Sequence, residues 1–265
     1  MQIACSTLSL HRDIPRTLPL LSFPAWCGSQ GIASIEVVDT QLPSLEPEFL
    51  GEFQRACAHA GVSLSCLALS NDFTLPDPDQ LFAQVERVRQ ILYDIAMPLH
   101  IPVVRVFIGM ADTTRAGDQR ALEAFRGLVT DLKVTGVTLA LENHGRVETT
   151  AAQTMALITG VNSPHFGSCL DFGNLPPERR YDAIAQLAPF AKHVHAKSYA
   201  FDAQGEETMI DYKRALATLT EFAYDGVIAI EYEGRDDAHT GILATKTLIE
   251  KYWEHPEAER GSQAA

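Results

Sequence analysis

The sequence has few cysteines, no long apolar run and no excess of basic residues, and each shortage excludes a class of protein. The five cysteines among 265 residues include no C-x-x-C pair, and their odd number argues against a fully paired disulfide framework. We therefore expect reduced thiols in a cytoplasmic protein. The N-terminus lacks the basic start and apolar run of a signal peptide. The longest uncharged stretch, residues 17–35, carries prolines, glycines and polar side chains and is a poor membrane span.

The charge balance is acidic. Lysine and arginine number 21 against 34 aspartate and glutamate residues, which gives a net charge of −13. Such a chain repels phosphate backbones and anionic lipid, so we expect neither nucleic acid nor a membrane as a partner. Hydrophobic residues make up 46% and charged residues 21%, the balance of a globular protein that buries a core.

Short runs rich in valine, isoleucine and leucine alternate with longer amphipathic segments. Eight runs predict strands of a buried parallel sheet, namely residues 2–6, 35–38, 63–69, 103–108, 137–142, 166–171, 193–197 and 227–231. Seven segments predict helices, namely residues 49–60, 78–96, 119–133, 150–159, 182–187, 210–222 and 241–252. Four glycines closely follow helical patterns and are expected to cap them, namely Gly61, Gly136, Gly160 and Gly226.

This alternation predicts an α/β protein with a single (β/α)8 TIM barrel. An open doubly wound sheet is the rival fold, but it usually has a glycine-rich loop after its first strand. Here residues 6–11 read STLSLH, without glycine. We find no linker or repeat, so we expect one barrel domain over residues 1–255 and a flexible C-terminal tail over residues 256–265.

Ionisable residues directly follow the apolar runs of the last four predicted strands, and these are Glu142, Asp171, His195 and Glu231. A buried strand does not carry a carboxylate without a partner, and in a barrel the C-terminal strand ends converge on one pocket. Three carboxylates brought together repel one another unless a cation lies among them. The pattern therefore predicts one divalent metal ion but does not choose among Mn²⁺, Mg²⁺, Co²⁺ and Zn²⁺. We take Mn²⁺ as the first expectation.

The seventh predicted strand carries two further polar side chains. His193, His195 and Lys197 alternate and therefore share one face of the strand. We expect His195 to be the ligand because it lies nearer the strand end, and His193 to be a deeper hydrogen-bonding neighbour. Lys197 either contacts substrate oxygens or is a solvated lysine. Arg105, inside the fourth predicted strand, is either a buried structural arginine or a substrate contact.

Four motifs cover these positions, reading LENHG at 141–145, LDFGN at 170–174, HVHAK at 193–197 and IEYE at 230–233. They resemble the xylose isomerase-like TIM barrel superfamily, the sugar phosphate isomerase/epimerase group, and the resemblance spans nearly the whole chain. It implies a metal bound by Glu142, Asp171, His195 and Glu231. In the ketose epimerases of this group the two glutamates also act as an acid/base pair on opposite faces of the substrate.

The substrate contacts match that group less well. The epimerases place a histidine three residues after the aspartate ligand, where this chain has Asn174, and a substrate-contacting glutamate in the region of Glu148. His144 follows the Glu-Asn pair, as in the metal-dependent C-glycoside deglycosidases and related lyases, where it resembles a catalytic base acting on a 3-oxo-sugar. Here it is either such a base or a loop histidine. The candidate substrate-binding residues are Lys197, Asn174, Glu148, Arg105 and His193.

Our leading hypothesis is a metal-dependent isomerase or epimerase of a keto-sugar or sugar derivative. It would abstract a proton next to a carbonyl through a metal-stabilised enediolate, with Glu142 and Glu231 moving protons and His144 assisting. The alternative is a lyase resembling the C-glycoside deglycosidases, and a catalytically inactive sugar-binding barrel is an alternative of another class. Endonuclease IV, a DNA-repair enzyme, shares the fold but needs three zinc ions and a basic groove. Because this chain is acidic, we do not expect DNA repair as its function. The family implies a dimer, a tetramer or an assembly with another subunit.

Overall fold

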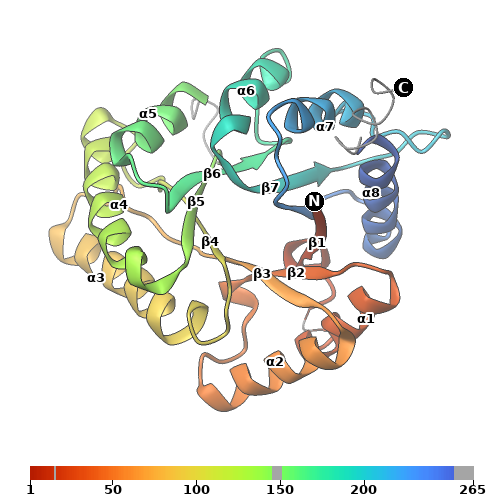
Figure 1. Cartoon of the computed structure of the whole chain (residues 1–265), viewed down its shortest axis with the longest axis horizontal. Coiled ribbons are helices and arrows are strands. Elements are labelled where there is room, and N and C mark those ends of the chain that lie inside the picture. The colour runs from red at the N-terminus through yellow and green to blue at the C-terminus, as the bar shows by residue number, and fades with distance from the viewer. Residues whose placement is uncertain (15, 145–150, 254–265) are drawn as a thin grey trace, which may run out of the picture.

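The structure is a computed structural model that describes residues 1–14, 16–144 and 151–253. Eight parallel strands form a closed barrel in chain order, with β8 paired back to β1 (Figure 1). The strands are β1 Gln2–Ser6, β2 Ser34–Val38, β3 Ser63–Ala68, β4 Val103–Val106, β5 Thr138–Glu142, β6 Phe166–Asp171, β7 Ala191–Ser198 and β8 Val227–Tyr232. The predicted (β/α)8 TIM barrel is confirmed.

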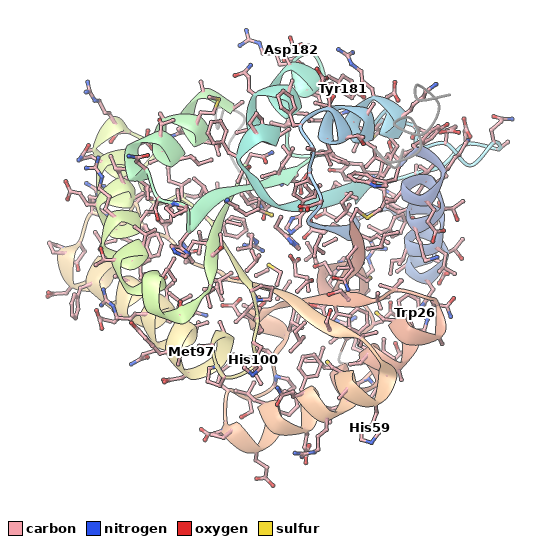
Figure 2. All side chains as sticks on the ribbon, in the orientation of Figure 1. Trp26, His59, Met97, His100, Tyr181 and Asp182 are labelled. Atoms are coloured by element: carbon pink, nitrogen blue, oxygen red, sulfur yellow. The ribbon has the colours of Figure 1, made fainter. Side chains whose placement is uncertain are left out.

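Helices surround the ring of strands on its outside (Figure 1). They are α1 Phe23–Ser29, α2 Pro47–Ala60, α3 Pro78–Ile91, α4 Arg115–Thr135, α5 Ala151–Val161, α6 Arg180–Leu187, α7 Tyr212–Glu221 and α8 Ala238–Tyr252. Because helices cover one side of each strand and opposite strands cover the other, β2 and β6 are buried at every position. Side chains fill the space inside the ring, so the barrel is a packed core and not a pore (Figure 2).

The helix α1 is absent from the sequence-based prediction. It has only seven residues, with Pro24 in its first turn, and it lies in the uncharged stretch that shows no clear helical periodicity. Tertiary packing holds it, since Phe23, Pro24 and Cys27 are buried. Gly28 permits this packing, because a Cβ there would lie 2.6 Å from the backbone oxygen of Ala60 at the end of α2.

The strand β4 ends two residues before the predicted boundary at residue 108. The side chain of Asn71, in the loop after β3, accepts a hydrogen bond from the backbone N–H of Phe107 at 2.9 Å. Its amide also donates to the carbonyl oxygen of Phe107 at 2.8 Å. The amide thus takes both backbone groups that a neighbouring strand would otherwise pair, and the ladder stops there.

Two of the four predicted glycine caps are right. Gly61 and Gly136 have φ of 67° and 72° and end α2 and α4. The other two are wrong. Gly160 lies inside α5, which is followed by Asn162 at φ 50°, and α7 is followed by Ala223 at φ 54° rather than by Gly226.

Several sequence-based expectations concern the ends of the chain and its thiols. All five cysteines are buried and free, as predicted. Among the described helices, none is long and apolar enough to cross a membrane. The first residue of the helix predicted over 150–159, the end of the predicted barrel domain and the predicted tail over 256–265 lie outside the described residues.

Candidate metal centre

The four predicted metal ligands lie in the C-terminal halves of β5 to β8, on the inside of the barrel. Glu142 pairs with Cys169 of β6, and Asp171 lies two residues further along that strand on the same face. Asp171 pairs with His195 of β7, and Glu231 lies two residues beyond the partner of His195 in β8. This stepped register follows from the tilt of barrel strands and keeps the four side chains together.

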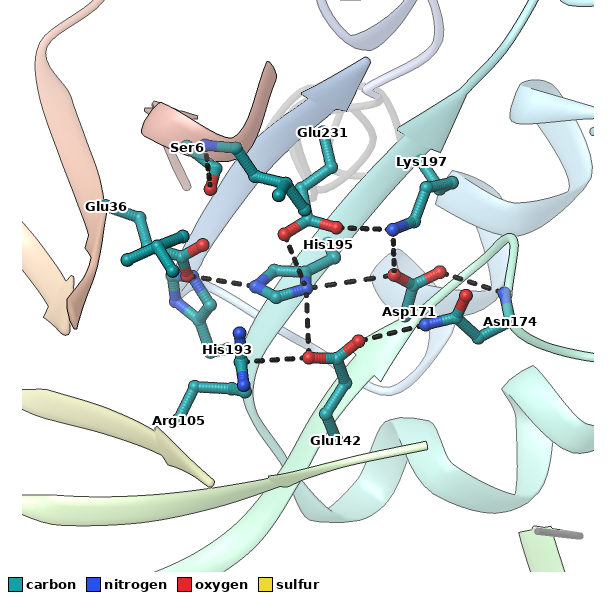
Figure 3. A network of polar contacts seen from close by, with 12 residues as sticks. Ser6, Glu36, Arg105, Glu142, Asp171, Asn174, His193, His195, Lys197 and Glu231 are labelled. Atoms are coloured by element: carbon teal, nitrogen blue, oxygen red, sulfur yellow. Dashed lines mark hydrogen bonds and ion pairs between the residues drawn. The ribbon is translucent and has the colours of Figure 1, made fainter. Parts of the chain in front are cut away.

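The imidazole of His195 lies at the centre of this group (Figure 3). Its Nδ1 lies 3.3 Å from Oε1 of Glu231. The same nitrogen lies 3.7 Å from Oε2 of Glu142 and 3.8 Å from Oδ2 of Asp171. Donor atoms bound at about 2.1 Å to one ion lie roughly 3.0–3.4 Å apart. The distance to Glu231 falls in this range, and the distances to Glu142 and Asp171 are longer.

Hydrogen bonds from the loop after β6 hold one oxygen in each of two predicted carboxylate ligands. In Asp171, Oδ1 accepts hydrogen bonds from the backbone N–H groups of Gly173 at 2.7 Å and Asn174 at 3.0 Å. In Glu142, Oε1 accepts from the Asn174 side-chain amide at 2.9 Å. Asn174, which stands where the ketose epimerases have a histidine, therefore supports two of the predicted ligands.

Lys197 is buried among these carboxylates and is not a solvated lysine. Its Nζ lies 2.6 Å from Oε2 of Glu231, 3.2 Å from Oδ2 of Asp171 and 2.8 Å from Oε1 of Glu233. Gly173 makes room for this side chain, because a Cβ at that position would lie 2.4 Å from Cγ of Lys197. Only a residue without a side chain fits there while the lysine keeps its path.

Arg105 also holds a predicted ligand. Its Nε lies 2.9 Å from Oε2 of Glu142, and its Nη1 donates to the carbonyl oxygen of Leu69 at 2.7 Å. The guanidinium lies 3.9 Å from the centroid of the Phe107 ring. Since the side chain is buried and has these protein partners, the structure favours the structural interpretation of Arg105 over a substrate contact.

The sequence-based prediction missed Glu36, in the middle of β2. Its Oε2 accepts a hydrogen bond from Nε2 of His195 at 2.9 Å and lies 2.9 Å from Nε2 of His193. His193 is thus the deeper neighbour that we expected, although its partner was not foreseen. The available signal was a single carboxylate inside the apolar run of residues 35–38.

The sequence pattern predicts no role for Asn143, the third residue of the LENHG motif. Its side-chain amide donates to the carbonyl oxygen of Asp171 and accepts from the N–H of the same residue, both at 2.9 Å. It therefore joins the end of β5 to the end of β6, as Asn71 joins the end of β3 to the end of β4. In both cases an asparagine in the loop after a strand takes over the backbone pairing of the next strand, Asn143 directly beyond β5 and Asn71 three residues beyond β3.

The charges of the cluster do not cancel. Its buried ionisable side chains are the carboxylates Glu36, Glu142, Asp171 and Glu231, the basic Arg105 and Lys197, and the imidazoles His193 and His195. If all four carboxylates are ionised and both imidazoles are neutral, as metal binding would require, the charges sum to −2, which one divalent cation would balance. Among the described residues, the buried Nδ1 of His195 makes no hydrogen bond, and Oδ2 of Asp171 has only the ion pair with Lys197. Buried polar atoms seldom remain so, and the donor set therefore fits a metal ion.

The two glutamates differ in their surroundings. Burial raises the pKa of Glu142, but the charges of Arg105 and His195 outweigh burial and bring the pKa below its usual range. Burial raises the pKa of Glu231 to about 7, against the opposing effect of His195 and Lys197. Two carboxyl groups with pKa values on either side of the ordinary range are typical of sites that move protons.

A cavity of about 290 Å³ lies between the loops after β3, β4 and β5. Its lining includes Asn71, Phe107, Met110 and His144. The imidazole of His144 packs on the Phe107 ring with centroids 4.4 Å apart. Because Arg105 lies over the same ring and contacts Glu142, the cavity is joined to the ligand cluster by direct contacts.

The predicted site residues therefore fall into three groups. The predicted ligands and their polar neighbours lie together, namely Glu142, Asp171, Asn174, His193, His195, Lys197, Glu231 and Arg105. His144 lies at the adjacent cavity. Glu148 lies outside the described residues.

Solved structures with the same architecture cover the whole chain. An L-ribulose 3-epimerase superposes with a TM-score of 0.77 at 19% identity, covering 100% of this chain and 99% of that chain. The probable 3-DHS dehydratase involved in petrobactin synthesis from Bacillus anthracis gives 0.74 at 17% identity, covering 95% of this chain and 99% of that chain. At such identities the likeness shows the fold alone.

Sequence relatives match a shorter segment. The C-glycoside deglycosidase alpha subunit of Microbacterium trichothecenolyticum is 38% identical over 69 residues, which is 24% of this chain and only 19% of that protein's length. A family model described as xylose isomerase-like TIM barrel matches residues 24–252. That match covers most of the chain, including all four predicted ligands, and this chain therefore belongs to the xylose isomerase-like TIM barrel family.

Proposed function

We propose that this chain is a divalent-metal-dependent isomerase or epimerase of a keto-sugar or sugar derivative. The observation that carries the proposal is the convergence of three carboxylates on Nδ1 of His195 inside the C-terminal end of the barrel. A set of three carboxylates around one imidazole nitrogen suits a divalent cation. Sugar 3-epimerases among the proteins of the same fold support the substrate class.

The proposed ligands are Glu142, Asp171, His195 and Glu231, with Mn²⁺ preferred. When bound, such an ion polarises a substrate carbonyl and stabilises the negative charge that develops on its oxygen. Glu142 and Glu231 come from strands on either side of β6 and β7 and approach His195 from different directions (Figure 3). One would take a proton from the carbon next to the carbonyl, and the other would return one to the opposite face or to the adjacent carbon.

The remaining polar groups would bind and orient the substrate. Lys197 and Asn174 reach the ligand cluster from β7 and from the loop after β6, so each could exchange a protein contact for a hydroxyl group of a sugar. We assign Arg105 and His193 to holding the ligands, because their polar atoms face protein carboxylates. The cavity beside Phe107 would take the part of the substrate that is remote from the reacting carbon.

Elemental analysis of the purified protein tests the proposal first. We expect about one divalent ion per chain, with loss of the ion when any of the four ligands is replaced by alanine. Glu233→Gln is the matched control, because Glu233 contacts Lys197 but is 38% exposed in its side chain and lies outside the ligand set. Absence of metal from the native protein, even after reconstitution, would contradict the proposal.

Proton exchange tests the chemistry. The metal-loaded protein, incubated with a panel of keto-sugars in deuterated water, should incorporate deuterium next to the carbonyl, and Glu231→Gln should abolish this incorporation. A protein that binds metal and sugar without any exchange or product would instead be a catalytically inactive sugar-binding barrel.

A lyase acting on a 3-oxo-sugar is the second candidate, and His144 is the observation that favours it. This histidine follows the Glu142–Asn143 pair and faces the cavity against Phe107, where it could act as a base on a bound substrate. The relatives named C-glycoside deglycosidase alpha subunit support this candidate. Release of an aglycone from a 3-oxo-C-glycoside, lost in His144→Gln, would favour the lyase over the epimerase.

The quaternary structure belongs to the same proposal. Because those relatives are named alpha subunits, we propose that the chain acts as a homo-oligomer or together with another subunit. Light scattering on the purified chain tests this, since a monomer that is fully active alone would contradict it.

A further inference from the structure

Glu36 is the one residue of the cluster that the proposed function does not use. It lies in the middle of β2, is fully buried, and has the apolar Ile35 and Val37 on either side. A register shift between β2 and β3 occurs at Ile35 and Glu36, where Ile35 pairs with Leu64 and Glu36 with Cys66. Such irregularities re-aim side chains next to functional sites. Burying a charged carboxylate this deep in the barrel costs free energy unless hydrogen-bonding or oppositely charged groups compensate for the lost hydration.

Glu36 contacts two histidines and also lies beside Cys66 of β3. Its Oε2 accepts a hydrogen bond from Nε2 of His195 at 2.9 Å and lies at the same distance from Nε2 of His193. The ring of His193 lies nearly perpendicular to that of His195, with centroids 5.4 Å apart. The carboxylate is thus confined between two imidazoles and points at only one side of His195.

The opposite side of the His195 ring faces the proposed metal ligands. A neutral imidazole carries one N–H, and when Nε2 holds the proton, Nδ1 has the lone pair. Nδ1 is the nitrogen that lies 3.3–3.8 Å from the oxygens of Glu231, Glu142 and Asp171. The bond to Glu36 therefore selects the tautomer and the ring orientation that a metal ligand needs.

We propose that Glu36 is a positioning residue of the metal centre, which holds His195 in the Nε2–H form while His193 holds Glu36. The inference rests on the proposed function, because it presupposes a metal bound at Nδ1. A metal-binding histidine usually donates its other N–H to a carboxylate or carbonyl group, and loss of that group typically costs 10- to 100-fold in metal affinity.

Competition with a chelator measures this effect directly, without reference to turnover. Glu36→Gln should bind Mn²⁺ about 10- to 100-fold more weakly than the native chain. Asp39→Asn is the matched control, because Asp39 directly follows β2 and is nearly buried, but its carboxylate contacts Ser70 and Arg87 and neither histidine. We expect Asp39→Asn to keep the native affinity.

A second variant separates position from charge. Glu36→Asp keeps the negative charge but withdraws the carboxylate by one methylene group, so it should also lose affinity. With Co²⁺ as the ion, the visible absorption bands should change in both Glu36 variants, since they report ligand geometry, and should not change in Asp39→Asn. If Glu36→Gln does not fold, as judged by circular dichroism, Glu36→Asp carries the test.

The outcomes distinguish the two proposals. If the native chain binds no metal, the proposed function fails. If it binds metal and both Glu36 variants keep the native affinity and absorption spectrum, the function stands and the positioning role is wrong. Full affinity in Glu36→Asp with loss only in Glu36→Gln would mean that Glu36 supplies charge alone, and would overturn the inference. Complete loss of binding in both would make Glu36 a direct ligand and would overturn it as well.

Discussion

The strands β1 to β4 and the strands β5 to β8 both send charged side chains into the barrel, but to different effect. In the second half, Glu142, Asp171 and Glu231 stand at or next to the ends of their strands and gather around Nδ1 of His195, which lies three residues before the end of β7. In the first half, Glu36 and Arg105 lie within their strands and contact residues of the second half. One half thus presents donor atoms, and the other half orients them.

This comparison indicates that the residues proposed to bind the ion and the residues that hold them in place come from different halves of the barrel. A donor atom must be able to exchange protein contacts for a ligand, so it belongs at the open end of the strands. A group that fixes a donor must have all its own partners within the protein, so it belongs deeper. Substitutions in the second half should therefore remove donor atoms, whereas substitutions in the first half should remove groups that orient or support them.

The largest expected effect is the loss of metal affinity when a carboxylate of the second half is replaced by an amide. The same replacement in the first half is the control. Asp171→Asn removes a donor, so metal affinity should fall by more than the roughly 100-fold seen when only a supporting group is lost. Asp39→Asn, at the end of β2, should leave metal content unchanged. Chelator competition measures both. Equal losses would show that the two halves do not differ.

The next effect concerns stability. Arg105→Met leaves Glu142 buried without its cationic partner, so the free energy of unfolding of the metal-free protein should fall by about 3–5 kcal/mol. Arg126→Met is the control, because Arg126 is exposed and donates only to the carbonyl of Gly160, so about 1 kcal/mol is expected. Urea unfolding measures the two values. A loss below 1 kcal/mol for Arg105→Met would mean that the pair contributes little.

Asn71 and Asn143, whose side chains pair with the backbone of a neighbouring strand end, sharpen the comparison further. Asn71→Ala and Asn143→Ala each remove two buried hydrogen bonds, and each should lower the free energy of unfolding by about 1–3 kcal/mol. Only Asn143→Ala should also weaken metal binding, because Asn143 fixes the backbone of Asp171. Thermal unfolding with and without Mn²⁺ checks this. A matching loss of affinity in Asn71→Ala would contradict the division.

The smallest effect is a pH dependence in the first half. Asp72 joins the loops after β3 and β4, accepting hydrogen bonds from Thr74 and from the N–H groups of Met110 and Ala111. Burial raises the pKa of Asp72, but these hydrogen bonds outweigh burial, and the pKa falls below 3.8. Because the folded-state pKa is lower than the unfolded one, Asp72 stabilises the fold above about pH 4 and loses this effect as the pH falls.

Asp72→Asn should therefore lower stability at neutral pH and flatten its dependence on pH in the acid range. Urea midpoints of the native chain and the variant at about pH 7 and pH 3 measure this. Parallel pH profiles would show that Asp72 stays ionised to the same extent in the folded and unfolded chain.

The same division explains what the sequence could predict. The strand-end donors stand out because each ionisable residue directly follows an apolar run, and the barrel topology then brings the ends together. Glu36 and Arg105 lie inside apolar runs, where the residue type alone does not show which group faces it. Their partners are set by register across the barrel, which no local pattern reveals.

Predictions from the local sequence were also wrong or incomplete at particular elements. The seven-residue α1 depends on contacts of Phe23 and Cys27 with the rest of the core and has no periodic signal of its own. The chain takes a left-handed conformation at Asn162 and Ala223, near glycines that were expected to take it. The early end of β4 depends on the side chain of Asn71, from another loop.

The close approach of Gly173 to Lys197 links the loop after β6 to β7, at two positions that lie 24 residues apart in the chain. A Cβ at position 173 would meet both Cβ and Cγ of the lysine and the hydroxyl of Tyr199. The two positions should therefore vary together in evolution. Relatives that keep a long side chain at position 197 are expected to keep glycine at position 173, and a larger residue at 173 should appear only where the side chain at 197 has shortened.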